Sequence, residues 1–201
     1  MSLLTMWDYV LTDDSLTALP ELVSEAAFNA LTAGKYASDT RLSAVLAAAS
    51  AAVRNYCGWH LAPSLACEYR ADSLHTGHTV QLPSRYVSSV ESVAVNGEVL
   101  PPSAYVLKPG GRILLRGKPR REGWNDIVVL YNAGLPSVPA EIAGVVATVA
   151  MHALASSGGI QSESAGGESV TYASSWLSGS ATSLPTNEQD ALSPYVVKGV
   201  W

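Results

Sequence analysis

The sequence predicts an α+β fold: a small α-helical core of two long helices plus short terminal helices, with an inserted antiparallel β-meander of about five or six strands. Two observations predict this class. Apolar residues recur every three or four positions in residues 39–57 and 139–156, as in amphipathic helices, whereas they alternate with period two in residues 64–134. We therefore expect an N-terminal arm at 1–37, a core at 38–157, and a flexible loop with a C-terminal docking arm at 158–201.

The first long helix is expected over residues 40–57. Ser38 or Asp39 can cap its N-terminus, and Gly58 is placed to end it. Its buried stripe comprises Leu42, Val45, Leu46, Ala49, Val53 and Tyr56. The opposite face carries small side chains, so another backbone can approach it closely. The subunit-interface candidates on this face are Ala44, Ala47, Ala48 and Ala51.

Short β-rich runs separated by turn residues predict the meander. The runs are ACEYRAD, TVQLP, VESVAVNGEVL, AYVLKPGGRILLR and DIVVLYNAG. Asn96-Gly97 is the favoured two-residue signal for a hairpin, because both residues tolerate positive φ. Pro109-Gly110-Gly111 predicts a second turn between strands.

A second long helix is expected over residues 140–155, with Glu141 near its positive end. Its apolar stripe comprises Ile142, Val145, Val146, Val149 and Ala153. After Glu141 it holds no Asp, Glu, Lys or Arg, so it lacks the usual solvated face. Two helices with so little charge offer more apolar surface than one modest core needs. We therefore expect oligomerisation, with Val146 and Ala150 as further interface candidates.

Residues 156–174, SSGGIQSESAGGESVTYAS, have the serines and glycines of a flexible linker. A phosphate-binding P-loop is excluded, because the stretch has no lysine and follows a predicted helix rather than a strand. We expect it to tether a docking arm that contacts a partner through large apolar residues near the C-terminus. Those candidates are Leu192, Tyr195, Val196, Val197, Val200 and Trp201. The alternative is that Trp201 packs into this chain's own core.

Composition and charge exclude several classes of function. The chain has 201 residues, of which 48% are hydrophobic and 14% charged, so it is expected to fold. Its 17 acidic and 12 basic residues give a net charge of −5, which argues against general nucleic-acid binding. The longest apolar run, residues 142–155, is shorter than the ~18 residues that a membrane span needs. The N-terminal residues lack the basic segment of a secretory signal.

Candidate metal and catalytic residues are few, and no cofactor is expected. Cys57, His60, Cys67, His75 and His78 have ligand-like spacings, but no paired Cys-x-x-Cys accompanies them. The alternative is that Cys57 ends a helix on its core face while the histidines lie in a polar turn. No Gly-x-Ser-x-Gly or His-Glu-x-x-His motif occurs, so we expect neither a metal site nor an enzyme.

One stretch of ten residues in the predicted meander holds five of the 12 basic residues. They are Arg112, Arg116, Lys118, Arg120 and Arg121. As a functional site, this basic cluster would contact phosphate or an acidic partner surface. The alternative is a solvated hairpin tip, which is the more common role of such charge runs.

Four short motifs occur in a distinctive order over residues 38–197. They are an alanine-rich helix ending in Tyr-Cys-Gly, a Val-x-Ser-Val strand before Asn-Gly, a Tyr-x-Ala-Gly turn before Val-Pro, and a Ser-Glu-Ser-x-Gly loop. This order resembles that of the head-tail connector proteins, also called adaptor or head completion proteins, of tailed double-stranded DNA bacteriophages.

The resemblance implies a structural virion protein without catalytic residues. Such connectors form a ring, commonly of about twelve subunits, beneath the portal, extend the DNA channel and offer a surface to the tail or a stopper protein. The implied partners are other copies of the chain, the portal protein, a tail or stopper protein, and genomic DNA that passes through without specific binding. The implied location is the virion neck, after assembly in the host bacterial cytoplasm.

Two other functions stay open on the sequence alone. A phage tail or capsid accessory β-domain would recognise a receptor or decorate the shell, and an exposed aromatic cluster on the meander would favour it. A hydrolase would be favoured by a pocket that brings Ser, His and Asp within hydrogen-bond distance.

Overall fold

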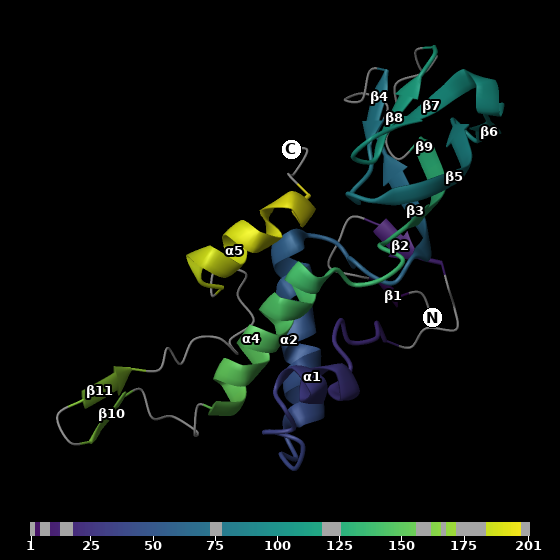
Figure 1. Cartoon of the computed structure of the whole chain (residues 1–201). Helices are drawn as coiled ribbons and strands as arrows, with labels where there is room; N and C mark the ends of the chain where they lie inside the picture. The colour runs from purple at the N-terminus through teal and green to yellow at the C-terminus, as the bar shows by residue number, and fades with distance from the viewer. Residues whose placement is uncertain are drawn as a thin grey trace. The chain divides into compact units, whose positions relative to one another are not determined.

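The computed structural model describes residues 3–4, 9–12, 18–72, 78–117, 126–155, 162–165, 168–171 and 184–197 (Figure 1). The predicted α+β class with antiparallel sheets is confirmed. The chain forms two compact units, which we call the β unit and the helical unit. The β unit comprises Met1–Leu19, Gly58–Ser137 and Tyr195–Trp201, and the helical unit comprises Pro20–Cys57 and Val138–Pro194.

The larger sheet of the β unit has six antiparallel strands in the order β1-β2-β3-β9-β5-β6. In that order they are β1 (Leu3–Leu4), β2 (Tyr9–Leu11), β3 (Leu65–Ala71), β9 (Ile127–Ala133), β5 (Val87–Val95) and β6 (Glu98–Val99). Side chains of the inner strand β9 alternate between buried and half-buried. One face of the sheet therefore contributes Ile127, Val129 and Tyr131 to the core of the unit.

A three-stranded sheet in the order β4-β8-β7 completes the β unit. Its strands are β4 (Thr79–Gln81), β8 (Arg112–Leu115) and β7 (Tyr105–Lys108), and the 3-10 turn η1 (Pro102–Ala104) precedes β7. Val80, Ile113 and Leu115 are its buried side chains. The period-two alternation predicts the strands but not this pairing, in which β4 joins β8 and β9 lies between β3 and β5.

Both predicted turns are confirmed by the backbone. Asn96 and Gly97 have φ angles of 52° and 80°, as a two-residue hairpin between β5 and β6 requires. Gly110 and Gly111 have φ angles of 77° and 73° and turn the chain between β7 and β8. A Cβ at Gly111 would overlap the carbonyl oxygen of Ser84, so only glycine lets this turn pack against the loop after β4.

His60 joins three segments of the β unit. Its buried ring has Nδ1 2.6 Å from the hydroxyl of Tyr9 on β2 and Nε2 2.9 Å from the carbonyl oxygen of Ala133 at the end of β9. Because a carbonyl oxygen only accepts, Nε2 carries the proton and Nδ1 accepts from Tyr9. The polar turn expected for the histidines is thus wrong for His60, whose buried polar atoms are satisfied by these hydrogen bonds.

In the helical unit, α2 (Leu42–Cys57) packs against α4 (Ala140–Ala155) (Figure 1). The carboxylate of Asp39 accepts from the backbone nitrogen of Arg41 at 2.9 Å just before α2, and Gly58 follows the helix with a φ of 77°. The two predicted apolar stripes are confirmed, since every member is buried except the half-buried Tyr56.

Shorter elements of the helical unit are α1 (Glu25–Leu31), α5 (Thr186–Leu192) and the paired strands β10 (Ser162–Ala165) and β11 (Glu168–Thr171). The 3-10 turn η4 (Ser193–Tyr195) follows α5. The hydroxyl of Ser24 caps α1 by accepting from the backbone nitrogen of Ala27 at 3.2 Å. The antiparallel β10–β11 pair lies in the stretch for which glycine and serine predict a flexible linker. These residues pair through backbone hydrogen bonds, which composition alone does not reveal.

Replacing Gly134 by alanine should destabilise the β unit far more than replacing Gly97. Both glycines have positive φ, 122° and 80°, so each substitution strains the backbone by roughly 1–2 kcal/mol. Only at Gly134 would the new Cβ also overlap the carbonyl oxygen of Pro63 and lie 2.8 Å from Nε2 of His60. We expect Gly134→Ala to lower the free energy of unfolding by about 3 kcal/mol or more in urea denaturation. Equal losses in the two variants would contradict this close packing.

Candidate functional site

The outward face of α2 is a surface of small side chains. Its four predicted interface candidates, Ala44, Ala47, Ala48 and Ala51, are all exposed. The residues between them, Val45, Leu46, Ala49 and Ser50, are buried. Ala47 and Ala48 each lie three or four positions from both Ala44 and Ala51, so the four exposed residues share one side of the helix. We call these four residues the alanine face.

The charged residues of α2 and its N-terminal approach are engaged within the helical unit. Arg41 pairs with Asp39 at 2.8 Å and donates to the carbonyl oxygen of Leu154 at 3.0 Å. Hydrogen bonds from Arg41 lower the pKa of Asp39, and the side-chain bond raises the pKa of Arg41. Arg54 is only 5% exposed and donates to the carbonyl oxygen of Pro20 at 2.7 Å. The alanine face itself carries no charge.

The two interface candidates on α4, Val146 and Ala150, are fully buried within the helical unit. Ala147 and Leu154 are buried as well, so α4 is covered on more than its apolar stripe. The lack of charge on this helix therefore reflects burial within its own chain. A side chain buried in this way contacts a second subunit only if the helical unit opens. Neither residue therefore belongs to the surface that we propose for contacts between copies.

The C-terminal docking candidates contact this chain as far as they are described. Leu192 in α5 is fully buried. The indole nitrogen of Trp59 donates to the carbonyl oxygen of Tyr195 at 2.7 Å, and Tyr195, Val196 and Val197 are half-buried. Val200 and Trp201 lie outside the described residues. The segment after α5 is thus held at Trp59.

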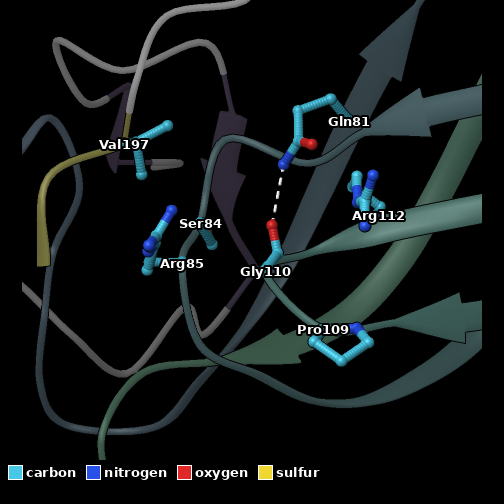
Figure 2. A pocket seen from close by; sticks show the side chains of 7 residues that line it. All are labelled: Gln81, Ser84, Arg85, Pro109, Gly110, Arg112 and Val197. Atoms are coloured by element: carbon cyan, nitrogen blue, oxygen red, sulfur yellow. Dashed lines mark hydrogen bonds between the residues drawn. The ribbon is translucent and has the colours of Figure 1, made fainter. Parts of the chain in front are cut away.

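The basic cluster is described only in part. Arg112 and Arg116 are exposed at the beginning of β8 and just after its end, whereas Lys118, Arg120 and Arg121 lie outside the described residues. Arg112 lines a pocket of about 450 Å³ in the β unit, together with residues far from it in sequence (Figure 2). The other lining residues are Gln81, Ser84, Arg85, Pro109, Gly110 and Val197.

The sequence does not indicate that Arg85 lines the same pocket as Arg112, because the two residues lie far apart along the chain. The pairing of β4 with β8 sets Gln81 opposite Arg112 and so brings the loop that follows β4, with Arg85, to the same pocket. Only knowledge of this long-range strand pairing could have indicated that the two arginines line one pocket.

The cysteines and histidines form no metal site within the described ranges, where no group of three or more His, Cys, Asp and Glu could hold a metal ion. Cys57 and Cys67 are buried, and desolvation raises the pKa of each thiol to about 12. Both thiols stay protonated at neutral pH, which makes them poor ligands and poor nucleophiles. His75 lies outside the described residues, and His78 is exposed.

Exposed aromatic side chains and long apolar helices are both scarce in the described part of the chain. Of the residues that the structure describes, Tyr86 is the one exposed aromatic side chain, so no aromatic cluster for receptor binding is present among them. Within the same part of the chain, no helix has the length and apolar character to cross a membrane.

Comparison with known proteins decides the family. The model of the head completion protein (HCP) family matches residues 21–184. The chain belongs to the head completion protein family. This confirms the resemblance seen in the order of its sequence motifs. A search of curated proteins finds no match to the chain.

Solved structures show where the head completion fold recurs. A chain described as from the neck of the native GTA particle, computed with C12 symmetry, has a TM-score of 0.54 at 17% identity. The match covers 92% of this chain and 97% of that one. A chain from the neck of the empty GTA particle, computed with C6 symmetry, has a TM-score of 0.58 at 18% identity, covering 92% and 95%. At this identity the likeness shows a shared fold.

The hydrogen bond from Trp59 to Tyr195 should raise the free energy of unfolding of this head completion protein when it is studied as an isolated chain. Trp59→Phe removes the indole donor to the carbonyl oxygen of Tyr195 and shrinks a fully buried ring. We expect the free energy of unfolding to fall by about 2 kcal/mol in chemical denaturation followed by circular dichroism.

Tyr56→Phe is the matched control for Trp59→Phe. It removes a hydroxyl whose contact with the carbonyl oxygen of Gln189 is long, at 3.4 Å, so it should change stability little. Unchanged stability of Trp59→Phe would mean that the segment after α5 is not held at this residue.

Proposed function

We propose that this chain is a structural protein of the virion neck, where copies of it form a ring under the portal, extend the DNA channel and join capsid to tail. The family match over residues 21–184 carries the proposal. The fold shared over 92% of the chain with chains from GTA particle necks supports it. The C12 symmetry of the native GTA neck supports a ring of twelve copies.

The alanine face of α2 is the surface best suited to contacts between copies. Interface cores are depleted in charged residues, and this face carries none. Burying an alanine costs no side-chain entropy, because it has no rotamers to lose. A neighbouring copy that packs against Ala47 and Ala48 therefore gains close contact at low entropic cost.

The portal contact is proposed for the residues that follow α5. Tyr195, Val196 and Val197 are half-buried and keep part of their apolar surface open to a partner. Val200 and Trp201 continue the apolar stretch in the sequence. Leu192 is left out of this contact, because it is fully buried in its own chain.

A channel protein should let DNA slide rather than hold it. The net charge of −5 weakens the attraction to phosphate groups that drives nonspecific DNA binding. The raised pKa of Cys57 and Cys67 removes both thiols as nucleophiles. These features support a protein without an enzymatic role. From the family match we further propose assembly in the host bacterial cytoplasm and partners that comprise the portal and a tail or stopper protein.

Replacing Ala48 by lysine should block ring formation and leave the chain folded. The side chain at this position is exposed, so lysine reaches solvent in the single chain but would bring a charge into the proposed contact between copies. We expect complete rings to be lost when the purified variant is mixed with the portal and examined by native mass spectrometry and electron microscopy.

Ala26→Lys is the control for Ala48→Lys. Ala26 is also exposed and helical, in α1, and the same substitution there should leave rings intact. Thermal unfolding of both variants should match that of the unaltered chain. Normal rings with Ala48→Lys would exclude the alanine face as the subunit contact.

A further inference from the structure

We propose that the pocket lined by Arg85 and Arg112 binds an acidic segment of a partner protein through its carboxylate groups. The pocket lies entirely in the β unit and does not include the alanine face of α2. Binding of an acidic peptide there is independent of ring formation.

Two loops and the C-terminal segment form the walls of this pocket. Ser84 and Arg85 lie in the loop after β4, and Pro109 and Gly110 lie in the turn between β7 and β8. Figure 2 shows Arg85 and Arg112 on either side of the hydrogen bond that joins Gln81 to Gly110. The volume of about 450 Å³ lies in the range of pockets that hold small ligands, so it suits a few peptide side chains.

The walls are fixed in position without a ligand. The side-chain nitrogen of Gln81 donates to the carbonyl oxygen of Gly110 at 2.9 Å (Figure 2), and the backbone nitrogen of Leu82 donates to that of Gly111 at 2.8 Å. The fully buried Ser84 places its hydroxyl 3.2 Å from that of Tyr131. These bonds join the loop after β4 to the β7–β8 turn and to β9. A pre-formed site binds with a smaller loss of conformational entropy.

The pocket concentrates positive charge on an acidic protein. Arg85 and Arg112 are both exposed, and the described residues that line the pocket include no aspartate or glutamate. Arg112 forms no ion pair with another described residue. A guanidinium group offers five planar N–H donors, several of which can match a carboxylate. Arg85 already has an interaction within its own chain, so an acidic side chain would take further donors of its guanidinium group.

An acidic peptide fits this site better than duplex DNA does. A duplex presents phosphates along a convex backbone and is bound by cations spread over a surface, whereas the two arginines line one concave pocket. Pro109 and Val197 add apolar walls that suit the methylene groups of a peptide but not a phosphate. The net charge of −5 also opposes the approach of a polyanion.

In the neck proposed above, this site would hold an acidic loop of an adjacent component. That use rests on the proposed function, whereas the binding of an acidic peptide to the isolated chain does not.

The test uses the full chain and a fluorescein-labelled hexaglutamate peptide, with binding measured by fluorescence anisotropy. We expect Arg85→Gln and Arg112→Gln each to weaken binding about tenfold or more, because each removes a charge-assisted hydrogen bond. Affinity should also fall when NaCl is raised from about 50 mM to about 300 mM. Arg85→Lys and Arg112→Lys, which keep the charge but lose the planar donors, should bind with intermediate affinity.

Arg116→Gln is the matched control, because Arg116 is exposed, follows the same strand and lies outside the pocket lining. It removes the same charge and should bind the peptide like the unaltered chain. Equal weakening by Arg116→Gln would overturn the site, since binding would then follow net charge alone. No binding of the peptide by the unaltered chain at millimolar concentration would also overturn it. A short DNA duplex that binds more tightly and loses affinity in the same two variants would assign the pocket to phosphate instead.

Discussion

The buried hydrogen bonds of His60 are the constraint on which the β unit depends. One imidazole ring bonds to Tyr9 on β2 and to Ala133 on β9, so it fixes the strand on one side of β3 and the strand on the other. Gly134 must be glycine, because the loop of His60 and Pro63 packs directly on its backbone. With β9 fixed, Tyr131 reaches Ser84, and burial raises the pKa of Tyr131 so that its hydroxyl stays protonated. The loop that carries Arg85 is therefore linked through Tyr131 to the strand that His60 contacts.

The helical unit offers a surface of a different chemistry. α2 and α4 bury their large apolar residues against each other and the rest of the unit, and α2 leaves alanines outside. A contact through the alanine face requires no charged group to be desolvated, so it should depend little on salt. The arginine pocket of the β unit should respond to salt strongly, because its ligand would be bound by exposed charges. The two proposed surfaces should thus differ in how strongly salt weakens their contacts.

Features that depend on residues close in the sequence could be predicted. α4 spans Ala140–Ala155 as its periodicity indicates, and Asn96-Gly97 forms the expected hairpin. Features that depend on distant pairings could not. In the sequence, His60 has the spacing of a metal ligand or a turn residue. Its role in the core could not be predicted, because only the pairings of β2, β3 and β9 bring its hydrogen-bond partners together. Arg85 reaches the pocket of Arg112 only once β4 pairs with β8. The uncharged sequence of α4 indicates apolar surroundings, but sequence cannot distinguish a partner subunit from the chain's own core.

Electron microscopy of the intact particle neck, at a resolution that separates helices, tests the central claim most directly. We expect a ring of copies of this chain directly beneath the portal, around the DNA channel, with the alanine face of α2 at the contact between neighbouring copies. A neck that lacks the chain would contradict the assignment to the neck. A ring in which the alanine face of every copy is exposed to solvent would contradict the proposed subunit contact.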